Sequence, residues 1–248
     1  MSGEPFFLVE AVPAPGEFLL SGDEGRHAAT VRRMRPGERV ILTDGRGWRA
    51  SADVMSTARG SLTLQVSEAT FDPEPTVRVV LVQALPKGER SELAVDLATE
   101  AGVDEIVPWQ STRCVARWTG SPDKALRGRA RWQTAAREAA KQSRRSRVPV
   151  VRPLADTGRV VELIRAADRA LVLHESGAVP LVSVTMPAAG DLLLVVGPEG
   201  GIAPEELELF HRAGAQLVRL GPEVLRTSTT AAVALGALGV LAGRWVGR

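Results

Sequence analysis

The hydrophobic pattern of the chain changes once, near residue 75. Up to that point, short apolar runs of β-type such as 38–43 and 61–66 are broken by Pro-Gly and Asp-Gly turn signals. This pattern predicts a small β-barrel or β-sandwich over residues 1–72. The prolines in 71–75 remove backbone donors and disfavour helix, so we interpret this segment as a linker.

From residue 76 to residue 248, strand-like apolar runs alternate with segments of helical period. The strand-like runs lie at 77–82, 105–108, 170–174, 192–196 and 216–220. The helical segments include 92–101, which Gly102 follows as a C-cap, and the basic segment 123–142. Alternation of this kind predicts an α/β domain over 76–248, with a parallel sheet and helices on both of its faces.

A glycine-rich loop, Gly197–Gly201, follows the run 192–196 directly and leads into a helix that starts at Pro204. Its glycines permit close backbone approach to a ligand, with amide donors facing that ligand. The alternative is an ordinary tight turn between strand and helix. Dinucleotide-binding Rossmann folds place their glycine fingerprint after the first strand, where this chain has none, so that class is disfavoured.

Composition is that of a soluble globular protein, with 44% hydrophobic and 24% charged residues. The single cysteine, Cys114, cannot form an internal disulfide, which favours a reducing, cytoplasmic location. One cysteine and three histidines form no recognisable metal-binding spacing, so we expect no metal. The N-terminus lacks signal-peptide features and the apolar tract 231–242 is too short to span a membrane, so we expect no membrane association.

The formal net charge is only +2, but basic residues gather in two stretches, 26–49 and 117–152. Each stretch alone could be a solvated face balanced by acids elsewhere. Two arginine-rich stretches together favour a polyanionic partner, because arginine forks onto phosphate and stacks on bases. Since the two stretches lie on opposite sides of the linker, we expect binding of this polyanion to span both domains.

Several motifs occur in the same order as in a known protein family. They are RHAATVRRMRPGERV at 26–40, PKG at 86–88, TEAGVDEIVP at 99–108, EAAKQS at 138–143, GPEGGIAPEE at 197–206, LG at 220–221 and LRTST at 225–229. On these motifs the chain resembles, over nearly its whole length, the ribosomal RNA small subunit methyltransferase E family of the SPOUT superfamily. It departs from the family pattern at Ser228, where Glu is frequent, and at Ala203, where Ser is frequent. We therefore give Ser228 no catalytic role.

The resemblance implies a SPOUT-type parallel sheet with a trefoil knot, closed by a helix over 227–245, behind an N-terminal PUA-like β-barrel domain. It also implies a homodimer and a methyl transfer from S-adenosylmethionine to N3 of a uridine in 16S rRNA, within the small ribosomal subunit. The expected cofactor-binding residues are His174, Gly197, Glu199, Gly200, Gly201, Leu220, Gly221, Leu225 and Arg226. The expected RNA-binding residues are Arg26, His27, Arg32, Arg33, Gln142, Ser143, Arg144, Arg145 and Arg147.

N3 of uracil is a weakly acidic imide nitrogen, which must lose its proton before or during in-line attack on the sulfonium methyl. The enzyme must align the reacting atoms and stabilise negative charge on the base. We assign the charge stabilisation to Arg226, and to Glu199 either proton acceptance or a contact with the ribose or amino group of the cofactor. Structural alternatives stay open: a helix-capping ion pair for Arg226, a surface carboxylate for Glu199 and a buried, hydrogen-bonded ring for His174.

Two other functions also stay open at this point. One is another SPOUT methylation, such as ribose 2′-O-methylation of tRNA or rRNA. The other is a non-enzymatic RNA-binding protein that keeps the fold without turnover.

Overall fold

The computed structural model describes residues 4–88 and 90–245, which form two compact units. The first unit consists of the chain up to Glu74 together with Ala140–Val148, and the second of Pro75–Ala139 together with the chain from Pro149 onward. The segment Ala140–Val148 thus groups with the N-terminal unit, although its position in the sequence places it in the range 76–248.

A six-stranded mixed sheet forms the first unit. Its elements are β1 (Phe6–Leu8), β2 (Gly16–Leu20), the short helix α1 (Gly22–Arg26), the π-helical turn η1 (His27–Val31), β3 (Arg39–Thr43), β4 (Trp48–Ala58), β5 (Ser61–Val66) and β6 (Thr70–Phe71). The strand order is β1-β3-β4-β5-β2, with β6 paired to β4, and only the β1–β3 pair is parallel among the described ladders. Leu42, Leu62 and Leu64 are fully buried between these strands. The predicted N-terminal β domain is confirmed.

The linker interpretation of 71–75 is wrong for its first two residues. Phe71 belongs to β6, and the carboxylate of Asp72 accepts a hydrogen bond from the Ser146 hydroxyl at 2.6 Å. A second attachment of Ala140–Val148 is the ion pair between Lys141 and Glu24 of α1, at 3.1 Å and with both side chains largely buried. These polar contacts explain why a segment distant in sequence packs with the N-terminal unit.

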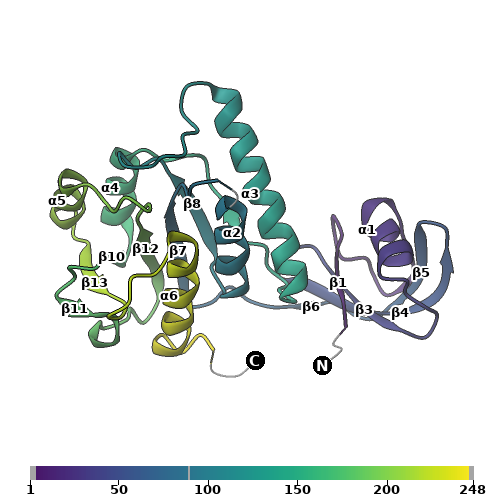
Figure 1. The fold of residues 1–248 in the computed structure, drawn as a ribbon. Helices are drawn as coiled ribbons and strands as arrows, with labels where there is room; N and C mark the ends of the chain where they lie inside the picture. The colour runs from purple at the N-terminus through teal and green to yellow at the C-terminus, as the bar shows by residue number, and fades with distance from the viewer. Residues whose placement is uncertain (1–3, 89, 246–248) are drawn as a thin grey trace. The chain divides into compact units, whose positions relative to one another are not determined.

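The second unit alternates strands and helices, as the hydrophobic pattern predicts (Figure 1). Its elements are β7 (Val77–Ala84), α2 (Arg90–Glu100), β8 (Glu105–Trp109), α3 (Pro122–Gln142, whose end lies in the first unit), β9 (Val150–Val151), α4 (Thr157–Ala166), β10 (Arg169–Leu173), β11 (Val179–Pro180), the 3-10 turn η2 (Leu181–Ser183), β12 (Gly190–Val196), α5 (Pro204–Arg212), β13 (Gln216–Arg219) and α6 (Thr227–Leu241). All five predicted strands are confirmed within two residues at each end. The two strands missed, β9 and β11, are only two residues long.

All seven strands of this sheet are parallel, in the order β11-β13-β10-β12-β7-β8-β9. Connections between parallel strands are right-handed, so helices that lead in opposite directions along the sheet lie on opposite faces. Helix α2 leads from β7 toward β9, whereas α4 and α5 lead toward β11. Accordingly, α4 packs on α5, and α6 packs on α2 and on strands β7 and β12. The central strands β7 and β12 are therefore covered on both sides, as their continuous apolar sequences require.

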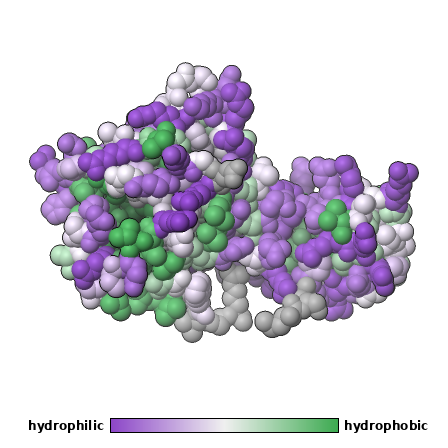
Figure 2. All heavy atoms as spheres, viewed as in Figure 1, coloured by the Kyte–Doolittle hydropathy of each residue, from purple (hydrophilic) through white to green (hydrophobic). Residues whose placement is uncertain are grey.

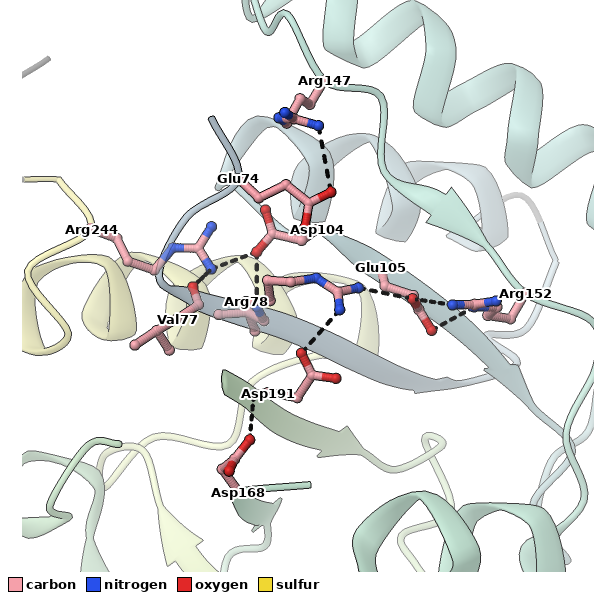
Figure 3. A network of polar contacts seen from close by, with 11 residues as sticks. Glu74, Val77, Arg78, Asp104, Glu105, Arg147, Arg152, Asp168, Asp191 and Arg244 are labelled. Carbon is pink, nitrogen blue, oxygen red and sulfur yellow. Dashed lines mark hydrogen bonds and ion pairs between the residues drawn. The ribbon is translucent and has the colours of Figure 1, made fainter. Parts of the chain in front are cut away.

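Ion pairs join the strands at the amino-terminal edge of this sheet (Figure 3). Glu105, which starts β8, is almost fully buried and accepts two hydrogen bonds from Arg152, at 2.7 and 2.8 Å. Arg78 of β7 reaches the same carboxylate at 3.3 Å and Asp191 of β12 at 3.2 Å. The charged groups of three neighbouring strands are thus paired at this edge of the sheet.

Helix α6 is shorter than the predicted 227–245, because Gly243 adopts a left-handed conformation (φ +64°) and ends it. Arg244 then turns back, and its guanidinium donates to Asp104 at 2.6 Å and to two backbone carbonyls. Trp245 packs closely against Gly239 of the same helix. The far end of α6 is therefore tied to the start of β8, on the side away from the helix N-terminus.

Candidate active site

A cavity of about 840 Å³ opens at the carboxyl ends of three neighbouring strands of the second unit. Strands β13, β10 and β12 lie side by side and parallel, so the loops that follow them meet at one edge. These loops line the cavity with residues 173–175, 196–202 and 219–227. In open α/β sheets this edge is where ligands bind, and the volume suits a nucleoside-sized ligand.

The glycine loop after β12 requires glycine at two of its positions. Gly201 has a φ of +72°, which other residues rarely adopt, and a Cβ on Gly197 would lie 2.6 Å from the Ile202 side chain. A Cβ on Gly200 would meet only Arg113, at an ordinary 3.5 Å. The loop is therefore tightly shaped by Gly197 and Gly201, whereas the fold itself has room for a side chain at Gly200.

Glu199 lies exposed on this loop and is held by a contact with the loop after β7. Its Oε1 accepts a hydrogen bond from the backbone N–H of Lys87 at 3.1 Å. The Pro86-Lys87-Gly88 motif and the GPEGG motif, distant in sequence, thus meet here. The second carboxylate oxygen accepts no hydrogen bond from the described residues, and Glu199 lines the cavity.

His174 follows β10, and its ring contacts Ser176. Its Nδ1 accepts the backbone N–H of Ser176 at 3.2 Å and lies 2.7 Å from the Ser176 hydroxyl. In the tautomer whose Nδ1 accepts this N–H, the ring proton lies on Nε2. The histidine is partly exposed at the cavity rather than buried, and its Nε2–H can donate to a ligand.

The third loop ends at Arg226, the N-cap of α6. The Arg226 carbonyl accepts hydrogen bonds from the backbone N–H of Thr229 and from the backbone and hydroxyl of Thr230. Its side chain is exposed at the cavity and, among the described residues, forms no ion pair. The capping ion pair considered from the sequence is therefore not observed. Ser228 is buried in the first turn of α6 and does not line the cavity.

The structure brings all the predicted cofactor-binding residues to this one cavity. Each of the following lines it: His174, Gly197, Glu199, Gly200, Gly201, Leu220, Gly221, Leu225 and Arg226. They come from three loops that are far apart along the chain, and only the parallel arrangement of β13, β10 and β12 makes them neighbours.

Glu206 is a structural residue of the site that sequence reasoning read only as an acid in a helix first turn. It is 3% exposed and accepts hydrogen bonds from three neighbouring segments. The donors are the hydroxyls of Ser111, Thr112 and Thr157 and the backbone N–H groups of Thr112 and Ala203, at 2.8 to 3.3 Å. Burial raises the pKa of this carboxyl, but the hydrogen bonds together hold the pKa below that of an ordinary glutamate. Glu206 also caps the helix at Ala203, where the chain lacks a serine.

Arg113 is a cavity residue that sequence reasoning missed. It follows Thr112, whose backbone Glu206 holds, and its Nη1 donates to the Gly200 carbonyl at 3.2 Å. It lines the same cavity as Arg226. Its position just after β8 could have indicated its role, because the loop after β8 lies at the same edge of the sheet as the glycine loop.

The predicted RNA-binding residues all belong to the first unit, whereas we expected them to be divided between the two domains. Arg33 and Arg144 are the two non-glycine residues with positive φ in the described chain, at +53° and +57°. Such conformations cost free energy and cluster at functional sites. Arg147 differs from the others, because its guanidinium donates to the Asp72 carbonyl at 2.8 and 3.2 Å. The N–H donors of Arg147 are thus used in contacts within the first unit.

Two family models match the chain. The RNA methyltransferase domain matches residues 72–239, and the RNA methyltransferase PUA domain matches residues 20–67. The first match covers most of the chain and includes the whole cavity. Fold and site together therefore define an RNA methyltransferase domain behind a PUA domain.

Curated relatives place the chain within that class. The ribosomal RNA small subunit methyltransferase E of Mycobacterium bovis is 51% identical over 245 residues, which are 96% of this chain and 92% of that protein. The Bacillus subtilis protein of the same name is 30% identical over 229 residues, 89% of each chain. The chain belongs to the ribosomal RNA small subunit methyltransferase E family, and the predicted resemblance is confirmed.

Solved structures agree with this assignment. The Neisseria gonorrhoeae ribosomal RNA small subunit methyltransferase E, bound to S-adenosyl methionine, has a TM-score of 0.83 at 28% identity and covers 96% of this chain and 98% of that chain. A putative methyltransferase from Legionella pneumophila, in complex with the same cofactor, has a TM-score of 0.81 at 26% identity and covers 96% of each chain.

Within the described ranges, no group of three or more His, Cys, Asp or Glu residues is placed to hold a metal ion. In the same part of the chain, every helix is too short or too polar to cross a membrane.

Proposed function

We propose that this protein transfers the methyl group of S-adenosylmethionine to N3 of a specific uridine in 16S rRNA. The observation that carries the proposal is the cavity: three loops at the carboxyl ends of β13, β10 and β12 bring the predicted cofactor residues together. Membership of the methyltransferase E family and the cofactor-bound structures of similar proteins support it. These relatives favour neither ribose methylation nor a protein without turnover.

The residues around the cavity fit this cofactor. S-adenosylmethionine carries a sulfonium and an ammonium as well as a carboxylate, and it therefore needs neighbours of both charges. The lining provides both signs, in Glu175, Glu199, Glu223, Arg113, Arg219 and Arg226. Backbone groups of the glycine loop and of Leu220–Gly221 bind the remaining polar atoms. When bound, the cofactor supplies an electrophilic methyl group on sulfur.

The chain's own residues then orient the base and stabilise its charge. Arg226, exposed at the cavity and anchored by the backbone of α6, stabilises the negative charge that develops on the uracil ring. Glu199 accepts the imide proton or holds the ribose or amino group of the cofactor. His174 Nε2–H donates to a cofactor oxygen or nitrogen. Arg113 holds the carbonyl of Gly200 and keeps the glycine loop in its binding conformation.

The first unit binds the RNA. Its PUA match at 20–67 and the exposed side chains of Arg26, Arg32, Arg33 and Arg144 support this role. We assign residues 1–72 to the PUA-like domain and 76–248 to the methyltransferase domain, with Ala140–Val148 added to the RNA-binding surface. His27, Gln142, Ser143 and Arg145 complete that surface, whereas Arg147 supports it from within. The substrate context we infer is the small ribosomal subunit in the cytoplasm.

A homodimer and a trefoil knot at the start of α6 belong to the same proposal. Hydrophobic atoms gather over the part of the second unit where α6 lies (Figure 2). Val233 and Val240 of α6 are 44% and 66% exposed, and a monomer rarely leaves such a face uncovered. Sedimentation at micromolar concentration should give the mass of two chains, and a monomer would contradict the dimer.

Calorimetry and methyl transfer test the function together. The wild-type protein should bind S-adenosylmethionine and transfer its methyl group to 16S rRNA or to small subunits that lack the modification. Gly201→Val should abolish cofactor binding, because valine rarely adopts a φ of +72°. Gly200→Val is the matched variant: its fold should be intact, so lost binding would show that the ligand needs the space at Gly200. Undiminished affinity in both variants would refute the site.

A further inference from the structure

An exposed aromatic pair lies on the first unit and shares no residue with the cavity. Trp48 starts β4 and Phe71 ends β6, and the two residues are directly opposite in the antiparallel ladder. Their ring centroids are 5.0 Å apart. They are 46% and 50% exposed, in a chain whose aromatic content is only 4%. Aromatic residues usually serve core packing, so two that are exposed side by side indicate a contact surface.

The pair is exposed because it lies beyond the end of the core. Alternation along β4 puts Trp48 on the same face as Ala50 and Ala52, which are fully buried. The alanines are covered by the core of the unit, whereas the larger rings next to them are not. Nothing in the strand pattern requires aromatic residues at these uncovered positions.

The backbone beneath the pair is held rigidly. The Asp44 carboxylate accepts the N–H of Trp48 at 3.1 Å and that of Arg46 at 2.7 Å. Asp72, next to Phe71, donates its N–H to the Gly47 carbonyl at 2.8 Å, and its carboxylate forms an ion pair with Arg49 at 2.9 Å. The rings are therefore presented in fixed positions, which reduces the entropy lost when a ligand binds.

Arginines lie next to the rings, and two of them also pair with acidic residues, Arg49 with Asp72 and Arg147 with Glu74. The Arg147 guanidinium lies 5.1 Å from the Phe71 ring centroid, in a cation–π contact, and packs against Gly47, where any Cβ would clash. Arg46, exposed, precedes the pair by two residues, and Arg144 is exposed on the segment that carries Arg147. The segment Ala140–Val148 contains no acidic residue. A polyanion with flat apolar groups complements this surface.

We propose that Trp48 and Phe71 form a stacking platform for an unpaired nucleobase of the substrate RNA. Single-stranded RNA is bound by stacking of its splayed bases on aromatic side chains, with arginines on the phosphates. A duplex hides its base faces, so the platform selects a loop, bulge or end of the RNA. This inference rests on the proposed RNA methylation and adds where, outside the cavity, the first unit holds the substrate.

The test is the affinity of a fluorescently labelled single-stranded oligoribonucleotide and of its duplex form, measured by anisotropy at several salt concentrations. Trp48→Ala should weaken single-strand binding by at least about fivefold, because stacking on one aromatic ring contributes that much or more. The salt dependence should stay unchanged, since no phosphate contact is lost. Trp48→Phe should keep most of the affinity, and Phe71→Leu should lose it.

Met55→Ala is the matched control, since Met55 is an exposed apolar residue of the same strand outside the pair, and it should bind as the wild type. Equal losses on single strand and duplex, or unchanged affinity in Trp48→Ala and Phe71→Leu, would overturn the platform. The double variant Arg33→Ala, Arg144→Ala separates the two claims: it should lower the salt slope whether or not the platform exists. A wild-type protein without salt-sensitive RNA binding would instead remove the proposed RNA substrate, and the platform with it.

Discussion

Replacing Glu206 tests whether one buried carboxylate holds together the segments behind the cavity. Glu206→Ala leaves five hydrogen-bond donors of neighbouring segments without their acceptor. Hydrogen bonds to a charged group contribute about 1.5–3 kcal/mol each, and breaking a buried charged network typically costs about 3–5 kcal/mol. We therefore expect the free energy of unfolding to fall by about 3–5 kcal/mol, a large part of the stability of an ordinary domain.

Glu206→Gln is the matched variant, because it keeps the shape and one acceptor oxygen. At neutral pH it should cost about 1–2 kcal/mol, less than alanine. The pKa of Glu206 in the folded protein lies below that of an ordinary glutamate, so the charged carboxylate stabilises the fold above pH of about 4.3. That stabilisation is lost as the pH falls through the lower, folded pKa. The difference between wild type and Glu206→Gln should therefore shrink in acid.

Urea unfolding followed by tryptophan fluorescence measures this difference. Trp109 is a suitable reporter, since it is fully buried and its indole N–H lies 3.4 Å from the Thr157 hydroxyl that also binds Glu206. Unfolding should be measured at neutral pH and at about pH 3.5, below the ordinary glutamate pKa. A difference between wild type and Glu206→Gln that is equal at both pH values, or an alanine variant as stable as wild type, would refute the reasoning.

Three further substitutions test other contacts. Arg113→Ala should weaken S-adenosylmethionine binding by roughly threefold to tenfold in calorimetry, the usual effect of one exposed hydrogen bond, whereas Arg117→Ala, outside the cavity, should not. Arg244→Ala should lower the free energy of unfolding by about 3–5 kcal/mol because it removes the ion pair of the largely buried Asp104 carboxylate, while Arg159→Ala, from an exposed pair, should change it by less than about 1 kcal/mol. Arg33→Gly should raise stability by about 0.5–1 kcal/mol by relieving its positive φ, yet weaken RNA binding; a less stable variant would contradict the strain argument.

The strands of the second unit were predictable because their side chains are buried on both faces. Continuous apolar runs such as those of β10 and β12 have no other stable place in a water-soluble domain. The two-residue strands β9 and β11 carry no such pattern, since strands this short bury too few side chains. The residues of the cavity were expected from the family resemblance, and the parallel strand order explains why their loops meet at one edge.

Contacts between distant segments were not predictable. Ala140–Val148 continues a basic helical sequence, and contacts that periodicity does not show, such as those with Glu24 and Asp72, group it with the first unit. Glu206 has the sequence position of a first-turn acid, and its burial depends on donors that lie 49 to 95 residues away. Such roles depend on the packed structure, and periodicity along the chain contains no information about them.

Nucleoside mass analysis of 16S rRNA most directly tests the claim that this cavity methylates a uridine of the small subunit. The rRNA should be taken from cells that lack the gene, and from the same cells with either the wild-type gene or the Gly201→Val variant restored. The account predicts that 3-methyluridine is absent without the gene, returns with the wild type and stays absent with the variant. Unchanged 3-methyluridine in the deletion strain, or the loss of a ribose-methylated nucleoside instead, would contradict it.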